Sequence, residues 1–456
     1  MGKIAIIGGG ISGLSLAYFI LEKDPSADVT VFESEKRPGG KIWTDRTDGF
    51  LCEWGVNGFL DNRPKTLELS RKLDLAPLRS NDASRKRFIY SGGVLHRLPE
   101  SPPAFLTSRL LSVGGRLRVM AEPFIPGNAR EEETLAAFAR RRLGNEAYEK
   151  LIDPMASGIY AGNPETLSLR ACFPKVYDLE KKYGGLIRGM IKLQREKKKQ
   201  GSKERVGAGP GGVLTSFSNG MGELIQALTT TLGDRVRLGH RAVSIDRKGR
   251  GYVLHFSDGS SYDTDSAILA SPAYAAAEIL KEMDRRLSSV VSEISYPSLA
   301  VACFGYKKEK FRGDLDAFGY LIPSREKRRI LGTLYDSSIF PNRAPEGYLL
   351  LRCMVGAARA SDLAMMQEPM LVDLIRKELS DIIGMTASPD FVRIYRHEMA
   401  IPQYTVGHRE RLREIDGILG KCKGLYLTGN AYRGIAVNDC IENSAGLAEK
   451  VIEESA

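Results

Sequence analysis

The stretch Ile4-Ala5-Ile6-Ile7-Gly8-Gly9-Gly10-Ile11-Ser12-Gly13-Leu14 decides the fold. The apolar residues before Gly8 are typical of a buried parallel strand, and an apolar helix is expected over 14–21. Gly8, Gly10 and Gly13 fill the three glycine positions of G-x-G-x-x-G: a tight turn, close approach of the backbone to a pyrophosphate, and close packing of helix on strand. We therefore predict a dinucleotide site at the helix N-terminus, whose free N–H groups and positive dipole end attract phosphate.

Glu33 supports this interpretation. It follows the predicted strand 29–32 and lies 20 residues after Gly13, where a carboxylate can bind both hydroxyls of an adenosine ribose. The ribose is then expected to carry no phosphate. A second match to the motif, at Gly207, Gly209 and Gly212, follows a lysine-rich run and contains Pro210, so we interpret it as a loop.

The composition is that of a folded protein of two or three domains, with 456 residues, 43% of them hydrophobic and 27% charged. The six cysteines form no C-x-x-C pair and the five histidines have no metal-ligand spacing, so a reduced, metal-free interior is expected. The first strand leaves no room for a signal peptide, and no apolar run is long enough to span a bilayer. We expect a cytoplasmic protein, free or bound to the inner face of the cell membrane.

The net charge of +10 is partly concentrated in one segment. The run 192–205 has seven basic and two acidic residues, a net charge of +5. Such a run is either a solvated linker or a segment attracted to anionic lipid headgroups. Nucleic acid is not expected as a partner, because no aromatic residues alternate with the basic ones.

The residues after Glu33 resemble the flavin-dependent amine oxidase superfamily. A glycine turn over 37–41 is followed by a strand that ends at Glu53-Trp54-Gly55. The resemblance implies a Rossmann-type domain that holds FAD without a covalent bond. Two residues differ: Lys41 stands where that family often has arginine, and Val56 where it often has proline. Lys41 can still meet a phosphate as a point charge.

The C-terminus resembles the same superfamily. A strand enters the turn at Gly429, and the segment 434–441 opens a last helix that we expect to run to Glu453, with Asn438 and Asp439 as N-cap candidates. A helix N-terminus aimed at a flavin stabilises negative charge on its reduced form. Cys440 does not lie in a motif for covalent attachment. The predicted cofactor-binding residues are Gly8, Gly9, Gly10, Ile11, Ser12, Gly13, Glu33, Ser34, Gly39, Gly40, Lys41, Gly55, Val56, Asn57, Gly58, Val243, Gly429, Asn430, Ile435, Ala436 and Val437.

The middle of the chain resembles the protoporphyrinogen oxidase family, in the segments 85–90, 95–103, 157–162, 318–323, 331–337 and 401–408. The resemblance implies oxidation of protoporphyrinogen IX to protoporphyrin IX in haem biosynthesis, with oxygen reoxidising the flavin. Coproporphyrinogen III is the alternative substrate. Because the cofactor carries the hard chemistry, no residue is assigned as acid, base or nucleophile.

Four residues are predicted to bind the substrate. Arg87 would pair with a propionate, since its fork fits a carboxylate. Phe318 and Leu321 would sandwich the macrocycle, and Met354 would add an adaptable apolar contact. The alternatives are a surface arginine paired with a nearby acid and, for the other three, ordinary core positions.

We predict an α/β protein, α+β overall, with three parts. The FAD-binding domain covers 1–77, 219–284 and 407–456, and the mixed-sheet substrate domain covers 78–92, 206–218 and 285–406. A helical membrane-binding insertion covers 93–205, with helices expected over 106–124, 131–143 and 147–157. An apolar stripe in the first of these helices, from Leu106 to Met120, is either core or a face that dips into one leaflet, and the resemblance favours the leaflet.

Three rival interpretations remain. A polyamine oxidase or carotenoid desaturase would keep both FAD ends and change the middle. A disulfide reductase would need a second functional dinucleotide motif and a redox C-x-x-C pair; the second glycine match is interpreted as a loop, and the sequence has no C-x-x-C pair. A lipid-escort protein of this fold would have lost the flavin. The sequence leaves open a homodimer and transfer of the product to the next enzyme of the pathway.

Overall fold

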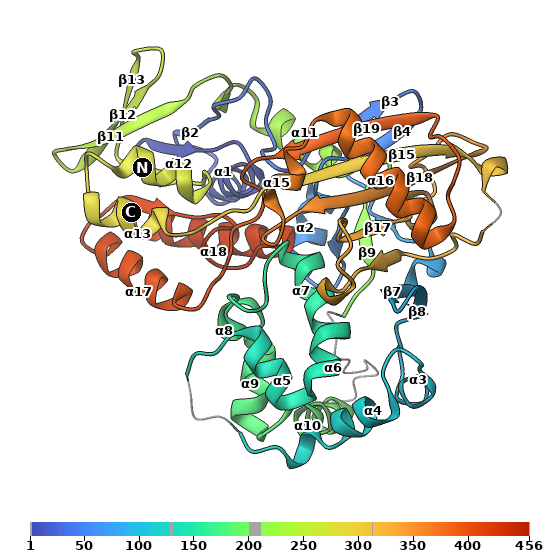
Figure 1. The fold of residues 1–456 in the computed structure, drawn as a ribbon. Helices are drawn as coiled ribbons and strands as arrows, with labels where there is room; N and C mark the ends of the chain where they lie inside the picture. Colours follow the sequence, from blue (N-terminus) through green and yellow to red (C-terminus); the bar gives the residue numbers. More distant parts are fainter. Residues whose placement is uncertain (1, 128–130, 200–210, 312, 456) are drawn as a thin grey trace.

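The computed structural model describes residues 2–127, 131–199, 211–311 and 313–455. Two sheet-containing parts lie side by side, and a group of helices from α3 to α10 lies below them in Figure 1. The fold is mixed α/β, as predicted. The sequence limits given above for the three domains stay predictions.

The first sheet has five parallel strands in the order β10-β2-β1-β14-β20. They are Val236–Arg237, Val29–Phe32, Ile4–Ile7, Ser266–Leu269 and Leu425–Leu427. The helices α1 (Ile11–Lys23), α11 (Gly222–Leu232) and α18 (Val437–Ser455) share one apolar cluster with this sheet. A second cluster joins it to α12 (Ala273–Leu280), α13 (Arg285–Ser292), α17 (His408–Leu419) and the antiparallel sheet of β11 (Ala242–Lys248), β12 (Gly251–Phe256) and β13 (Ser261–Thr264). Both ends of the chain therefore meet in one sheet.

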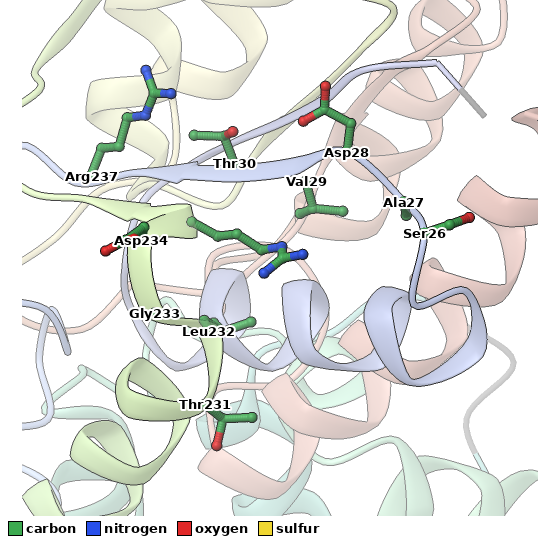
Figure 2. Close-up of a pocket in the computed structure, with 11 residues that line it drawn as sticks. Ser26, Ala27, Asp28, Val29, Thr30, Thr231, Leu232, Gly233, Asp234 and Arg237 are labelled. Atoms are coloured by element: carbon green, nitrogen blue, oxygen red, sulfur yellow. The ribbon is translucent and has the colours of Figure 1, made fainter.

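A cavity of about 500 Å³ lies at the outer edge of this sheet (Figure 2). It opens between the start of β2 and the turn that follows α11, and its lining residues include Asp28, Asp234 and Arg237. Ligands of open α/β sheets bind beyond the carboxyl ends of the strands, where the glycine motif lies. This cavity begins at the amino end of β2 and is therefore not the predicted dinucleotide site.

The second sheet has seven strands in the order β19-β15-β18-β17-β16-β7-β8. They are Phe391–His397, Leu299–Lys307, Tyr348–Gly356, Gly332–Leu334, Gly319–Leu321, Arg87–Ser91 and Val94–Arg97. Only β16 and β7 pair in parallel, so the sheet is mixed, as predicted. The sequence over 368–383 predicts an amphipathic helix, and α16 (Glu368–Ile383) has these bounds and packs against this sheet. The sequence over 317–323 and 330–335 predicts strands, and the observed strands β16 and β17 are shorter than these ranges.

Small sheets join the two parts. β3 (Thr44–Thr47) pairs with β4 (Phe50–Glu53), and β9 (Leu214–Ser216) lies between β5 (Phe59–Leu60) and β6 (Leu78–Arg79). The helix α2 (Pro64–Lys72) packs beside α18. The short helices α14 (Asp336–Ile339) and α15 (Ser361–Ala364) contact β18.

The helical part differs from the prediction. The expected helix 106–124 is two short ones, α3 (Pro102–Thr107) and α4 (Val113–Met120), because the hydroxyl of Ser112 accepts the Gly115 N–H at 3.0 Å and starts a new helix. Thr134 caps α5 (Leu135–Leu143) in the same way, so that helix starts later than expected. The expected helix 147–157 is divided among α6 (Asn145–Ala147), a π-helical turn (Tyr148–Ile152) and α7 (Asp153–Tyr160). The remaining helices are α8 (Leu169–Cys172), α9 (Pro174–Tyr183) and α10 (Leu186–Lys199).

The basic run is helical as far as Lys199, because α10 extends into it. The rest of that run, and Gly207, Gly209 and Pro210 of the second glycine motif, lie outside the described residues. Gly212 lies in no helix or strand, in agreement with the predicted loop.

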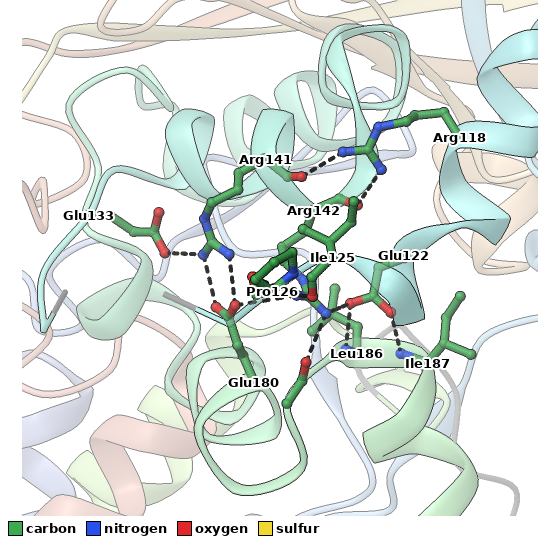
Figure 3. A network of polar contacts seen from close by, with 11 residues as sticks. Arg118, Glu122, Ile125, Pro126, Glu133, Arg141, Arg142, Glu180, Leu186 and Ile187 are labelled. Atoms are coloured by element: carbon green, nitrogen blue, oxygen red, sulfur yellow. Dashed lines mark hydrogen bonds and ion pairs between the residues drawn. The ribbon is translucent and has the colours of Figure 1, made fainter. Parts of the chain in front are cut away.

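A buried network of charges holds the helical part together (Figure 3). Glu122 and Arg142 are both fully buried and form an ion pair. The carboxylate of Glu122 also accepts the N–H groups of Leu186 and Ile187 at 2.8 and 3.0 Å, at the start of α10. Arg142 donates to the carbonyl oxygen of Ile125 at 2.7 Å. Since a buried charge is tolerated only when it is paired, these contacts fix α5, α10 and the turn before Ile125 as one unit.

Replacing Arg142 with methionine should destabilise this unit, because Glu122 would keep its buried charge and lose its counter-ion. We expect the free energy of unfolding in urea to fall by about 3–5 kcal/mol. Arg97→Met is the control, since the Arg97–Glu100 pair is exposed, and should change stability by less than about 0.5 kcal/mol. Equal urea curves for the two variants would contradict the role of the network.

Candidate functional site

The glycine turn between β1 and α1 has the geometry that the sequence predicts. Gly8 has φ +118°, and its N–H donates to the carbonyl oxygen of Phe32 at 2.7 Å. A Cβ atom on Gly13 would overlap the carbonyl oxygen of Gly8, whereas a Cβ atom on Gly10 would meet nothing within 4 Å. Gly13 thus serves packing, and Gly10 borders open space where a phosphate can approach the N-terminus of α1.

Glu33 is buried at the carboxyl end of β2, beside this turn. Its Oε2 accepts the Gly9 N–H at 2.7 Å, and its Oε1 accepts the Ser34 hydroxyl at 3.0 Å and the Glu35 N–H at 2.9 Å. The carboxylate therefore holds the glycine turn. Binding ribose hydroxyls would require some of these bonds to be exchanged, so that role stays a prediction.

The second glycine turn contacts the first directly. The Gly39 N–H donates to the carbonyl oxygen of Gly9 at 2.7 Å, and a Cβ atom on Gly40 would lie 3.5 Å from the Cα atom of Gly10. The next residue points elsewhere: the Lys41 ammonium donates to the carbonyl oxygen of Met399 at 2.6 Å. Burial, and secondarily the charge of Arg37, lower the pKa of Lys41. Its predicted phosphate contact stays untested.

The C-terminal segment lies against the first turn of α1, as the predicted site requires. Gly429 follows β20 with φ +117°, and a Cβ atom there would lie 3.9 Å from the hydroxyl oxygen of Ser12. The Ser444 hydroxyl donates to the Ser12 carbonyl oxygen at 2.8 Å, which joins α18 to α1. The first turn of α1, which follows the first glycine turn, therefore also lies beside the turn at Gly429.

The predicted N-caps of the last helix are wrong. The helix α18 begins at Val437, so Asn438 and Asp439 lie inside its first turn. Asn438 donates to the carbonyl oxygen of Leu60 at 2.8 Å, and the Asp439 carboxylate accepts the Ala436 N–H at 3.2 Å. The second contact has the form of half a capping box. Ile435 and Ala436 directly precede this helix and Val437 is its first residue, while their predicted role in cofactor binding stays untested.

The turn after β4 has two buried polar atoms that no partner satisfies among the described residues. They are the indole Nε1 of Trp54, a donor, and the amide Oδ1 of Asn57, an acceptor. Such atoms are costly unless a ligand or water pairs with them. The pyrimidine edge of a flavin offers an N–H group and carbonyl oxygens, so this turn, with the exposed Gly55 and the half-buried Val56 between, fits the predicted cofactor.

Two further predicted residues have distinct surroundings. The pairing of β11 with β12 shifts register between Ala242 and Ser244, which leaves Val243 in a β-bulge with its backbone available to a ligand such as adenine. Gly58 packs against β9, where a Cβ atom would press on the carbonyl oxygen of Thr215. A structural reason is therefore sufficient for glycine at position 58.

The second sheet brings three of the four predicted substrate residues together on one face, whereas Phe318 precedes β16 and has no place in this register. Leu321 pairs with Gly332, which pairs with Met354, and partners opposite each other point to the same side of a sheet. Arg87 pairs with Gly319, two residues before Leu321, and so belongs to the same face. Because the residue between them is Gly332, Leu321 and Met354 have no side chain between them.

Arg87 lies at the edge of this face. Its guanidinium carbon is 5.0 Å from the centroid of the Phe318 ring. With Arg85, Leu98 and Glu100 it lines a cavity of about 200 Å³. In the described part of the chain no carboxylate is within ion-pair distance of Arg87, which favours a ligand carboxylate over the surface-pair alternative.

Sequence reasoning missed four buried charges between the two sheets. Arg352 pairs with Asp336 at 3.0 Å, and Arg343 lies 3.5 Å from Glu53. Burial raises the pKa of Glu53 and of Asp336, and the arginines oppose that shift. The signal in the sequence was Arg352, a charged residue within the apolar strand 349–355, which needs a buried acidic partner.

The described residues contain no cluster of His, Cys, Asp or Glu that could hold a metal. Nor is any of their helices long and apolar enough to cross a membrane.

Comparison with known proteins gives a consistent result along the whole chain. The family model for flavin-containing amine oxidoreductases matches residues 11–452. The chloroplastic protoporphyrinogen oxidase of Oryza sativa subsp. japonica is 34% identical, over 98% of this chain and 87% of the relative. The coproporphyrinogen III oxidase of Bacillus subtilis (strain 168) is 29% identical, over 96% and 95%.

A crystal structure from Exiguobacterium sp. 255-15, which carries a provisional protoporphyrinogen oxidase name, has a TM-score of 0.84 and 26% identity over 99% of both chains. The cyclohexylamine oxidase of Brevibacterium oxydans IH-35A has a TM-score of 0.70 at 15% identity, covers 99% of both chains and shares the fold.

Alanine substitutions should separate the two glycine roles. Gly10→Ala should leave folding intact and weaken flavin binding by about tenfold or more, because the methyl group enters the open space at the helix N-terminus. Gly13→Ala should destabilise the protein itself by about 1–3 kcal/mol. Both quantities are measurable, by flavin titration of the flavin-free protein and by urea unfolding.

The matched control is Gly446→Ala in α18, where a Cβ atom meets nothing within 4 Å. Alanine there should change neither property unfavourably. Normal flavin affinity in Gly10→Ala would show that the phosphates lie elsewhere.

Proposed function

This chain belongs to the flavin-containing amine oxidoreductases and, within that family, to the protoporphyrinogen oxidases; it is an FAD-dependent oxidoreductase, and we propose that its substrate is a porphyrinogen. The observation that carries the proposal is the 34% identity to a protoporphyrinogen oxidase along 98% of the chain. The reaction would be the oxidation of protoporphyrinogen IX to protoporphyrin IX in haem biosynthesis. Molecular oxygen as final acceptor, a homodimer and transfer of the product to a following enzyme stay predictions.

Bound FAD supplies the capacity to accept hydrogen from the saturated bridges of a porphyrinogen. The protein then has to bind the cofactor and the substrate and to orient them relative to each other. The first turn of α1 and the start of α18 would hold the cofactor, and Trp54 and Asn57 would meet the flavin edge. Leu321 and Met354 would contact the macrocycle, and Arg87 would hold a propionate. No acid or base is required from the chain.

Coproporphyrinogen III is the second candidate substrate. It is supported by the Bacillus subtilis coproporphyrinogen III oxidase, of whose length this chain covers 95%. Arg85 and Arg87 line the same cavity and would suit a substrate with several carboxylates. The two candidates are distinguished by which porphyrinogen reduces the flavin faster.

Anaerobic mixing with each porphyrinogen should bleach the flavin absorption. In Arg87→Ala, half-maximal bleaching should need about 10–100 times more substrate, because a charge-assisted hydrogen bond contributes about 1.5–3 kcal/mol. FAD content should stay at the wild-type level.

Lys86→Ala is the control, since Lys86 pairs with Asp316 and does not line the cavity. Failure of both porphyrinogens to bleach the flavin would overturn the proposed function. A wild-type response of Arg87→Ala would overturn only the role of that residue.

We also propose that the helical part rests on an anionic membrane surface, at the inner face of the cell membrane. Its short helices expose apolar side chains that a protein core would bury, led by Phe124 at 82% and Val113 at 64% exposure, with Leu106, Leu117 and Met120 nearby in sequence. Residues 93–205 include 21 basic and 13 acidic side chains, a net +8 of the total +10. An apolar face beside excess positive charge is typical of interfacial helices.

The protein should therefore co-sediment with vesicles of anionic phospholipid, and less with zwitterionic ones or at high salt. Leu117→Ser combined with Phe124→Ser should weaken binding by about tenfold or more, since each side chain contributes about 1.5–3 kcal/mol when buried. Met370→Ser, an exposed methionine on α16, is the control. Equal sedimentation of the double variant and the wild type would contradict this surface.

A further inference from the structure

The turn after β4 is held by the second sheet through its backbone. Three successive carbonyl oxygens, those of Glu53, Trp54 and Gly55, accept hydrogen bonds from side chains of β18 and β19. Arg352 donates to Glu53 at 3.4 Å and to Gly55 at 3.0 Å, and the ring nitrogen Nε2 of His397 lies 3.0 Å from the Trp54 oxygen. The part of the chain that would bind substrate thus sets the path of a turn that would meet the flavin.

Asp336 holds the other end of this turn. It begins α14, and its Oδ2 lies 3.0 Å from the Nε atom of Arg352. Its Oδ1 accepts from the Asn57 amide at 3.4 Å. The Arg352–Asp336 ion pair therefore contacts residues on both sides of Val56. The Asn57 Oδ1 and Trp54 Nε1 atoms remain without hydrogen-bond partners in the described structure.

Arg352 is also linked to the predicted substrate face. It stands two residues before Met354 in β18, and its strand partners are Leu334 and Cys303. Residues two apart in a strand point to the same side, so Arg352 and Met354 share a face. A molecule that contacts Met354 would lie next to the side chain that holds the turn.

A structural role alone does not account for this pair well. Two fully buried charges can often be replaced by apolar residues of similar volume without loss of stability. An arginine fork, in contrast, can fix several acceptors in one plane, which an apolar side chain cannot do. The contacts of Arg352 go to carbonyl oxygens of a turn whose Gly55 is exposed, and not only to the core.

We propose that Arg352 and Asp336 are a positioning pair, which orients the turn 53–57 against the flavin ring and couples it to the substrate face of the second sheet. The proposal rests on the family's flavin and not on which porphyrinogen is oxidised. The neighbouring pair of Glu53 and Arg343 has a different task. Glu53 accepts the Thr44 hydroxyl at 2.6 Å and the Met221 N–H at 2.7 Å, and so anchors β4 to the first part of the chain.

The test compares Arg352→Met with Arg343→Met, since both remove a buried arginine and leave a carboxylate behind. Both should unfold at lower urea concentration than the wild type. Only Arg352→Met should shift the flavin absorption bands and the flavin midpoint potential, measured with a chemical reductant so that substrate identity does not enter. Flavin reduction by porphyrinogen should also slow by at least tenfold in this variant, with a smaller change in KM.

A second readout needs no cofactor. Trp43 and Trp54 are the two tryptophans of the chain, and Trp54 stacks on Tyr395 with centroids 4.8 Å apart. In flavin-free protein, the near-UV circular dichroism and the tryptophan emission should change in Arg352→Met and stay close to the wild type in Arg343→Met.

The double variant Arg352→Met/Asp336→Leu separates positioning from stability. It removes both charges, so stability should return toward the wild type, while the altered flavin and tryptophan signals should remain. Arg352→Lys, which keeps the charge and loses the fork, should restore these signals only in part, and it replaces the methionine variant if that one does not fold. Wild-type spectra, potential and reduction rate in folded, flavin-loaded Arg352 variants would overturn the proposal.

Discussion

No side chain fits at Gly13, because a Cβ atom there would overlap the carbonyl oxygen of Gly8. This close approach places the first turn of α1 against the end of β1, and the rest of the site is built on it. The Gly39 N–H reaches the Gly9 carbonyl oxygen, and α18 reaches the Ser12 carbonyl oxygen through Ser444. A larger residue at position 13 would separate three segments that must converge on one cofactor. The motif is therefore a packing constraint as well as a predicted phosphate site.

The need to bring these segments together also explains why the first sheet takes strands from the start, the middle and the end of the chain. The first sheet takes β1 and β2 from the start of the chain, β10 and β14 from the middle and β20 from the end. The second sheet and the helical part are inserted between these strands, and the chain crosses from one part to the other several times. Each crossing, such as the turn after β4, brings backbone of the first part within reach of side chains of the second. Contacts of such long sequence separation form late and slowly in folding.

Elements with a strong local sequence signal could be predicted from the sequence, whereas contacts that depend on tertiary pairing could not. The glycine turns and α16 have strong local signals, either a spacing of small residues or an apolar period, and the structure has them where expected. The expected helix 106–124 failed because Ser112 competes locally as a cap, which an apolar stripe does not reveal. Arg352 of β18 and Asp336 of α14 were missed because charged side chains are usually exposed. Only pairing across the fold shows that these are buried.

The turn 53–57 links the predicted cofactor site to the second sheet. By sequence it belongs to the cofactor half, but its carbonyl oxygens are held by Arg352 and His397 of the second sheet. In the proposed arrangement, in which this turn meets the flavin, the flavin environment can change through β18 and β19 while the glycine turns stay as they are. Relatives named for two different porphyrinogens match this chain almost from end to end, at 34% and 29% identity, and an amine oxidase shares its fold at 15%. That pattern is expected if the second sheet, which we propose faces the substrate, distinguishes one enzyme from another and the nucleotide turn does not.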